Sequence, residues 1–137
     1  MAEAKRVLVL GGHGFIGRYA VRWLVTAGAS VTIGSRAPRT PMEERYQLHR
    51  AVTKEDWQET AGRFDVILNC VGILRQRPFE TYDAVHNRAP AAIAAACKDT
   101  NTRFVHVSAL GLSAQAKSRF LTSKFHGEQA VVSSGAS

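Results

Sequence analysis

Short apolar runs alternate along this chain with longer segments in which apolar side chains recur at helical spacing. A short run rich in Val, Ile and Leu is typical of a buried strand. The clearest runs predict four strands, at Arg6–Leu10, Ser30–Gly34, Asp65–Val71 and Arg103–Ser108. A weaker run at Tyr46–Val52 is the candidate for one more short strand.

Helical periodicity fills the intervals between these runs. Apolar side chains recur at i, i+3 and i+4 through His13–Ala27, and Gly28 follows in the position where glycine commonly ends a helix. The prolines within Ala37–Met42 indicate a loop. Further helices are predicted at Lys54–Ala61, at Phe79–Lys98 with an interruption near Pro90, and at Ser118–Ser133.

The order of these elements predicts the class of fold. Strands separated by helices pair in parallel through right-handed crossovers. Near-continuous apolar strands fit a sheet that is covered on both faces. We therefore expect an α/β, three-layer Rossmann fold, with a parallel sheet of about five strands and helices on both faces. A length of 137 residues suits one such domain, spanning residues 1–137.

A glycine-rich loop lies between the first strand and the first helix. Gly11 permits a tight turn, Gly14 lets a pyrophosphate approach the backbone, and Gly17 lets the helix pack closely on the sheet. The free N–H groups at the helix start can then receive phosphate oxygens. The loop thus predicts a dinucleotide site, whose candidate contacts are Gly11, His13, Gly14, Phe15, Ile16 and Gly17.

His13 lies inside this loop. Its imidazole has the chemistry of a ligand or a proton carrier. The interpretation that we favour is that the backbone of His13 faces the phosphates, while its ring is exposed to solvent or packs over the cofactor.

The end of the second predicted strand distinguishes NAD from NADP. An acidic residue there would accept hydrogen bonds from the adenosine ribose, but the sequence has Ser35 and Arg36, with Arg39 close by. A carboxylate repels a 2′-phosphate, whereas a guanidinium pairs with it in a bidentate manner. Ser35 is a second candidate donor to that phosphate. These residues favour NADP(H), with NAD as the alternative.

The chain is strongly basic, with a formal net charge of +7 and a pI of about 10. Such a charge is typical either of nucleic-acid binding or of a solvated basic surface with a clamp for an anionic cofactor. Arg and Lys are scattered along the chain, without an aromatic–basic motif or a helix-turn-helix pattern. We therefore expect no nucleic-acid partner.

Cysteine content and hydropathy bear on the compartment. Cys70 and Cys97 are far apart and match no metal or redox spacing, so we expect buried thiols and no metal site. No apolar run approaches the ~20 residues that a bilayer requires. These features predict a cytoplasmic protein without a membrane span.

Later motifs add a resemblance to a known family. The segments concerned are residues 11–17, Asn69-Cys70-Val71-Gly72, Phe104-Val105-His106-Val107-Ser108, and Ser123-Lys124 followed by Gly127-Glu128. Taken in order, these motifs resemble the short-chain dehydrogenase/reductase superfamily in its extended or atypical branch, which includes NAD-dependent epimerases and dehydratases. The narrower similarity is to the atypical group that includes the nucleotide-binding accessory subunit of respiratory complex I.

The resemblance implies where a cofactor would lie. It would cross the carboxyl ends of the strands, bordered by Cys70, Val71 and Gly72. Lys124 would hydrogen-bond the nicotinamide ribose, and Ser108 and Lys124 would be the catalytic residues. The two long helices, Phe79–Lys98 and Ser118–Ser133, are those through which extended members often dimerise, so a homodimer is expected as one arrangement.

The sequence departs from the family pattern at the catalytic motif. The family has Tyr, three residues and then Lys, but the residue at that spacing before Lys124 is Phe120, which has no proton to give or take. The chain also stops soon after Lys124, where family members continue into a substrate-binding part. We therefore expect the C-terminal part of the family fold to be missing, and residues 1–137 to be the N-terminal part of a longer protein.

Two functions follow from these observations. The first is an NADP(H)-binding domain of an oxidoreductase or an epimerase/dehydratase, which would transfer hydride. The second is a non-catalytic nucleotide-binding module with a structural cofactor or a redox-sensing role, which Phe120 favours. No substrate can be assigned from these residues.

Overall fold

A computed structural model describes residues 4–41, 43–72, 76, 78, 80–107 and 118–134. Its centre is one parallel sheet of five strands in the order β3-β2-β1-β4-β5. The strands are β1 (Arg6–Leu10), β2 (Ser30–Ser35), β3 (Glu44–Arg45), β4 (Val66–Asn69) and β5 (Arg103–His106). The prediction of a parallel α/β sheet is confirmed.

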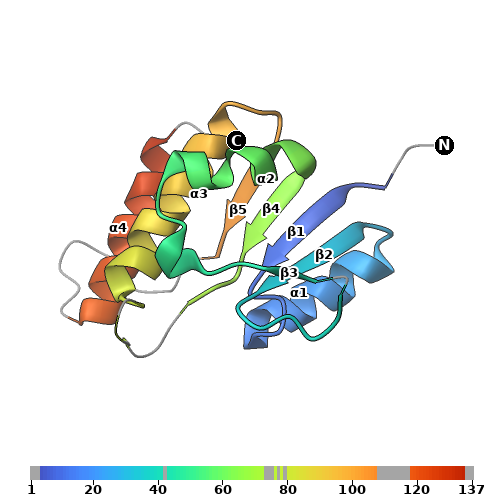
Figure 1. Cartoon of the computed structure of the whole chain (residues 1–137), viewed down its shortest axis with the longest axis horizontal. Coiled ribbons are helices and arrows are strands. Elements are labelled where there is room, and N and C mark those ends of the chain that lie inside the picture. Colours follow the sequence, from blue (N-terminus) through green and yellow to red (C-terminus); the bar gives the residue numbers. More distant parts are fainter. Residues whose placement is uncertain are drawn as a thin grey trace.

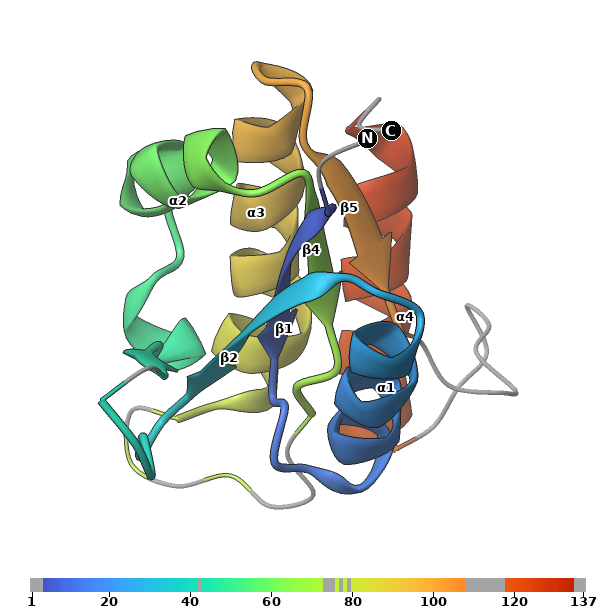
Figure 2. The same ribbon diagram turned by 90° about the vertical axis from the view of Figure 1, so that its right-hand side faces the viewer.

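Helices cover the two faces of the sheet unequally. The helices α3 (Ala89–Lys98) and α4 (Arg119–Ser133) lie on one side of the sheet, whereas α1 (Phe15–Thr26) lies on the other (Figure 1). The short helix α2 (Gln58–Arg63) lies beside α3 (Figure 2) and packs against it. Three layers therefore form as predicted, with α1 as the described helix of the second face.

The predicted strand at Tyr46–Val52 is wrong. The third strand is β3, which pairs with the end of β2, and the chain then turns into a 3-10 helix, η1 (Leu48–Arg50). Leu48 is buried in the core, and the Tyr46 ring stacks on Trp57 at a centroid distance of 5.4 Å. The apolar residues of this segment therefore pack against neighbouring helices and not across a sheet.

The interruption predicted near Pro90 is confirmed. A π-helix, η3 (Asp83–Arg88), runs directly into α3, with Pro90 in the first turn of α3. Because proline has no N–H group, it cannot supply the usual backbone hydrogen bond at this point. The second 3-10 helix, η2 (Lys54–Trp57), leads into α2 and begins with a capping box between Thr53 and Asp56.

The main core lies between the sheet and the layer of α2, α3 and α4. It is built from aliphatic side chains of the strands and small residues of α3, with Trp57 and Ile93 fully buried. Gly28 has a φ of 93° directly after α1, as predicted for a residue that ends a helix.

The face beside α1 is more open than the sequence suggests. Phe15, Tyr19 and Trp23 repeat every four residues along α1, yet all three are exposed. Next to them lies a groove of about 680 Å³, lined by residues of α1 and of the sheet that include Trp23, Val66 and Val105. Part of the apolar periodicity of α1 therefore faces solvent in this chain.

Candidate cofactor-binding site

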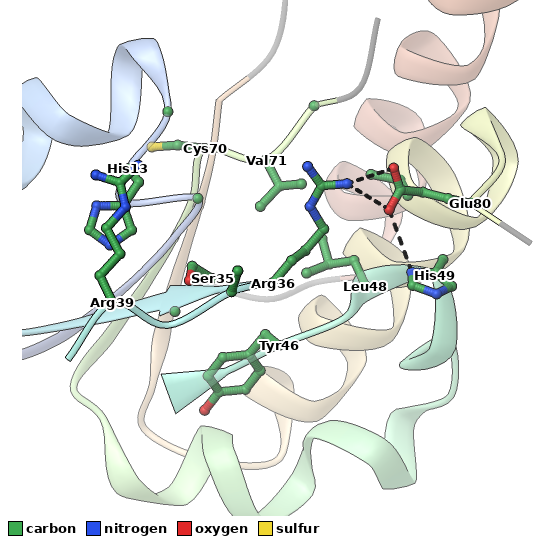
Figure 3. A pocket seen from close by; sticks show the side chains of 16 residues that line it. His13, Ser35, Arg36, Arg39, Tyr46, Leu48, His49, Cys70, Val71 and Glu80 are labelled. Carbon is green, nitrogen blue, oxygen red and sulfur yellow. Dashed lines mark hydrogen bonds and ion pairs between the residues drawn. The ribbon is translucent and has the colours of Figure 1, made fainter. Parts of the chain in front are cut away.

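A cleft of about 390 Å³ opens at the carboxyl ends of β1, β2 and β4. The connections from β1 and from β4 leave in opposite directions at this point, which is where ligands bind in open parallel sheets. The lining residues come from five separate segments of the chain, which Figure 3 shows converging. They are Gly11, His13, Gly14, Gly34, Ser35, Arg36, Ala37, Arg39, Tyr46, Leu48, His49, Cys70, Val71, Gly72, Glu80 and Val85.

The glycine loop turns as its spacing predicts. Gly11 has a φ of 75°, and its N–H donates to the carbonyl of Gly34 at 2.9 Å. A Cβ atom on Gly17 would overlap the backbone of Gly11 and Gly12, so only glycine allows α1 to approach this closely. Glycine is therefore required at positions 11 and 17 for different reasons, one conformational and one steric.

The first turn of α1 has no internal partner for its N–H groups. Gly14 is the N-cap residue, so no side chain caps the helix, and the first turn has no acidic residue. The N-terminus of an uncapped helix carries partial positive charge and free donors. Gly14 lines the cleft, which places these donors at its wall.

The other loop residues are arranged differently from one another. Phe15 and Ile16 are exposed in the first turn of α1 and do not line the cleft, and Gly17 is buried against the loop backbone. The side chains of Phe15 and Ile16 therefore do not form the wall of the cleft, and Gly17 acts on the loop through close packing. Their predicted contact with a cofactor stays a prediction.

His13 lines the cleft, and its ring is held by a neighbouring side chain. Its Nε2 atom lies 2.5 Å from a carboxylate oxygen of Glu43. This hydrogen bond is the largest cause of a lowered pKa at Glu43. Glu43 therefore holds the imidazole at the wall of the cleft with its side chain 25% exposed, and the packing of the ring over a cofactor stays a prediction.

Arg36 extends across the cleft to a buried carboxylate. Its Nη1 atom donates to both carboxylate oxygens of Glu80, at 2.9 and 3.0 Å. Nδ1 of His49 lies 3.8 Å from the same carboxylate (Figure 3). The Glu80 side chain is 10% exposed, and that of Arg36 is 55% exposed. The guanidinium that the sequence suggested for a phosphate is therefore already paired.

Ser35 and Arg39 lie on the other side of Arg36, toward the glycine loop (Figure 3). The Ser35 hydroxyl is buried and has no hydrogen-bond partner among the described residues. The backbone N–H of Arg39 donates to Glu43 at 3.3 Å, and no ion pair joins its guanidinium to any carboxylate within the described ranges. The Arg39 guanidinium is thus available to a ligand, and the Ser35 hydroxyl has hydrogen-bonding capacity that no described residue uses.

The turn after β4 forms the roof of the cleft. The amide N–H of Val71 donates to Oδ1 of the buried Asn69 at 3.1 Å, which fixes the chain where it leaves the strand. Cys70, Val71 and Gly72 line the cleft, as the resemblance implies. Both cysteines are free, and burial raises the pKa of the half-buried Cys70, so its thiol is protonated at neutral pH.

Lys124 lies behind this turn. It is buried, and its Nζ atom donates to the carbonyl of Val107 at 3.3 Å. A Cβ atom placed on Gly72 would lie 3.9 Å from that Nζ, so the ammonium lies next to the end of β4. Burial lowers the pKa of Lys124, while Cys70 and Glu128 oppose the change. The other predicted catalytic residue, Ser108, lies outside the described residues.

Phe120, four residues before Lys124, packs in a cluster of rings. Its ring meets that of His86 edge-on at 5.1 Å and that of Tyr82 at 6.0 Å. The Nδ1 atom of His86 lies 2.9 Å from the hydroxyl of Ser123. His86 and Ser123 are buried in this cluster, whereas Tyr82 and Phe120 are partly exposed, and Phe120 brings no ionisable hydroxyl to it.

The described part of the chain contains neither a candidate metal site nor a candidate membrane-spanning helix. No group of three or more His, Cys, Asp or Glu side chains there could hold a metal ion. None of its helices combines the length and the hydropathy that crossing a bilayer demands.

Sequence comparison connects the chain to known proteins. The model of the NAD dependent epimerase/dehydratase family matches residues 7–134. A ceramide reductase from Caulobacter vibrioides is 27% identical over 130 residues, which are 91% of this chain and 41% of that protein.

Solved structures give the same fold. A short-chain dehydrogenase/reductase superfamily protein from Agrobacterium tumefaciens with bound NAD superposes with a TM-score of 0.70 at 20% identity, over 92% of this chain and 44% of its own. WbmG from Bordetella bronchiseptica, in complex with NAD and UDP, has a TM-score of 0.75 at 13% identity, over 98% and 52%. The chain therefore spans about half the length of these proteins or less.

Proposed function

Because the chain belongs to the NAD-dependent epimerase/dehydratase family, within the short-chain dehydrogenase/reductase superfamily, we propose that its cleft binds a nicotinamide dinucleotide. The observation that carries the proposal is the uncapped start of α1 behind the glycine loop. Its free N–H groups suit a pyrophosphate, which needs donors and a backbone without side chains. The unpaired Ser35 hydroxyl in the same cleft also suits an incoming polar ligand.

We propose NADP(H) as the form that binds more tightly, with NAD as the alternative. No acidic side chain follows β2, and Arg36 and Arg39 both line the cleft. Cations at this position favour a 2′-phosphate, which a carboxylate would repel. The proteins of known structure named above hold NAD, so the preference must be measured.

The chemistry of a nicotinamide suits an oxidoreductase or epimerase/dehydratase role, which we propose for the whole protein. When bound, a nicotinamide supplies hydride transfer. In this chain Lys124, beside Gly72, is the residue that we assign to the nicotinamide ribose, with Ser108 as its catalytic partner. The relative named a reductase adds support, although this chain spans only 41% of it.

A second candidate function is a nucleotide-binding module without catalysis. Phe120 favours it, because replacing a tyrosine by phenylalanine spares binding but removes the general acid–base. The variant Phe120→Tyr separates the two functions. Turnover of NADPH with a panel of carbonyl compounds, gained only in the variant, would identify a decayed enzyme. Unchanged inactivity with intact binding would favour the module.

Three further expectations belong to this proposal. Residues 1–137 form one dinucleotide-binding domain, the N-terminal part of a longer protein, since relatives are about twice as long. The protein is cytoplasmic, which two free cysteines suit. A homodimer through α3 and α4 is the remaining expectation, although seven of the ten residues of α3 are already buried within the chain.

The test is a calorimetric titration of the purified chain with NADPH and with NADH. Gly14→Val is the informative variant, because the φ of −74° at Gly14 suits any residue while valine methyl groups would obstruct the helix N-terminus. Gly62→Ala is the matched control, since a Cβ there meets nothing within 4 Å. We expect the unaltered chain and Gly62→Ala to bind the dinucleotide and Gly14→Val not to bind it. Binding that Gly14→Val leaves unchanged would contradict the proposed location.

A further inference from the structure

Two arginines line the adenosine end of the cleft, but their charges are not equally available. Arg36 is held by Glu80 through both carboxylate oxygens. Arg39 has no ion pair with any carboxylate in the described part of the chain. A 2′-phosphate entering this cleft would therefore meet one neutralised cation and one free cation.

The Arg36–Glu80 pair is costly to break. The Glu80 side chain is 10% exposed, so its carboxylate is largely removed from water. A buried carboxylate without a partner is strongly disfavoured. If Arg36 turned away toward a phosphate, the one cation left beside Glu80 among the described residues would be His49, whose Nδ1 is 3.8 Å away and beyond hydrogen-bonding distance. Arg36 is therefore expected to stay with Glu80 when a nucleotide binds.

The side of the cleft near Arg39 offers a more suitable set of groups for an anion. Arg39 lies toward the glycine loop, and Ser35 lies between the two arginines (Figure 3). The Ser35 hydroxyl is buried without a hydrogen-bond partner among the described residues. The nearest acid, Glu43, is engaged by the ring of His13 and by the backbone N–H of Arg39. A guanidinium without an ion pair and a hydroxyl without a hydrogen-bond partner among the described residues thus line the same side of the cleft.

We infer that Arg39, with Ser35, is the residue that determines selectivity for a 2′-phosphate, and that Glu80 suppresses the contribution of Arg36 by neutralising it. The inference rests on the proposed dinucleotide function. It assigns Glu80 the role of a positioning residue, which acts on the ligand through Arg36. The sequence pattern alone pointed to Arg36, because it follows β2 directly.

Four variants test the inference by titration with NADPH and with NADH. Arg39→Gln removes the free cation, and Glu80→Gln releases Arg36. The double variant Arg36→Gln/Glu80→Gln replaces the ion pair, whose net charge is zero, by two uncharged side chains. Arg22→Gln, on the exposed surface of α1 and outside the cleft, is the control for loss of a positive charge.

We expect Arg39→Gln to weaken NADPH binding by about 10- to 100-fold, which is the loss of one charge-assisted contact, while NADH binding changes by less than about twofold. Glu80→Gln should tighten NADPH binding by about tenfold, because Arg36 is then free. The double variant and Arg22→Gln should both bind NADPH within about threefold of the unaltered chain.

The opposite pattern would overturn the inference. If the double variant lost NADPH selectivity while Arg39→Gln kept it, Arg36 would be the phosphate ligand in spite of Glu80. If the unaltered chain bound neither dinucleotide, the proposed function itself would fail. A thermal melt of each variant, compared with that of the unaltered chain, separates lost binding from lost folding.

Discussion

The buried histidine of the aromatic cluster predicts how the stability of this chain depends on pH. The side chain of His86 is stacked on Tyr82 at a centroid distance of 5.5 Å and is 1% exposed. Burial, followed by the nearby Lys124 and His106, lowers the pKa of His86 to about 4. Ser123 donates its hydroxyl to the carbonyl of Phe120, so it accepts from Nδ1 of a neutral His86.

The sign of the effect follows from which state binds more protons. In the unfolded chain the pKa of a histidine is about 6.5, so between pH 6.5 and 4 the unfolded state binds the extra proton. The contribution of His86 to the free energy of unfolding is fully present above pH 6.5 and is lost as the pH falls toward 4. By pH 4.5 the loss amounts to about 2 to 3 kcal/mol.

The assay is urea unfolding followed by circular dichroism at pH 7, 5.5 and 4.5, on the unaltered chain and on His86→Asn. An asparagine amide can still donate to Ser123 but does not titrate. We expect the free energy of unfolding to fall less steeply with acidification in the variant, by about 2 to 3 kcal/mol over the range. Groups that do not interact with His86 titrate alike in both proteins and cancel. Equal pH dependence in the two proteins would refute the reasoning.

Three further predictions concern packing. Gly17→Ala should abolish NADPH binding in calorimetry and lower the melting temperature, because its Cβ would overlap the backbone of Gly11. Gly62→Ala, in helix α2, should leave binding unchanged and should not lower the melting temperature. Trp23→Ser, at a side chain that is 70% exposed, should leave the melting temperature unchanged but reduce binding of an apolar dye to the groove beside α1. Thr102→Val should lower the free energy of unfolding by about 1 to 3 kcal/mol in urea titrations, because the buried hydroxyl donates to the carbonyls of Ala61 and Phe64. A change under about 0.5 kcal/mol would contradict this.

Features with a local physical cause were the most accessible from sequence. The apolar run at Arg6–Leu10 is β1 without any change of bounds, because a strand at the centre of a sheet is buried on both faces. The glycine loop was predictable since steric and dihedral requirements act within a few residues. By the same logic Gly28 and Pro90 marked the end of one helix and the interruption of another.

Features that depend on distant partners were out of reach. Nothing near Glu80 indicates that its carboxylate will meet Arg36, which is 44 residues away. His13 and Glu43 are 30 residues apart, and nothing in the sequence pattern indicates their contact either. The strand expected at Tyr46–Val52 failed for a related reason, because its apolar residues pack against Trp57 and the core and not across a sheet.

The strand order has a consequence for synthesis on the ribosome. The central strand β1 leaves the ribosome first, yet one of its two neighbours, β4, is made only after β2, β3 and α2 have followed. Until then the apolar segment Val7-Leu8-Val9-Leu10 can pair on one side at most. An unpaired apolar strand edge is prone to aggregate. The nascent chain should therefore depend on early shielding of β1, and slower translation between β2 and β4 would lengthen its exposure.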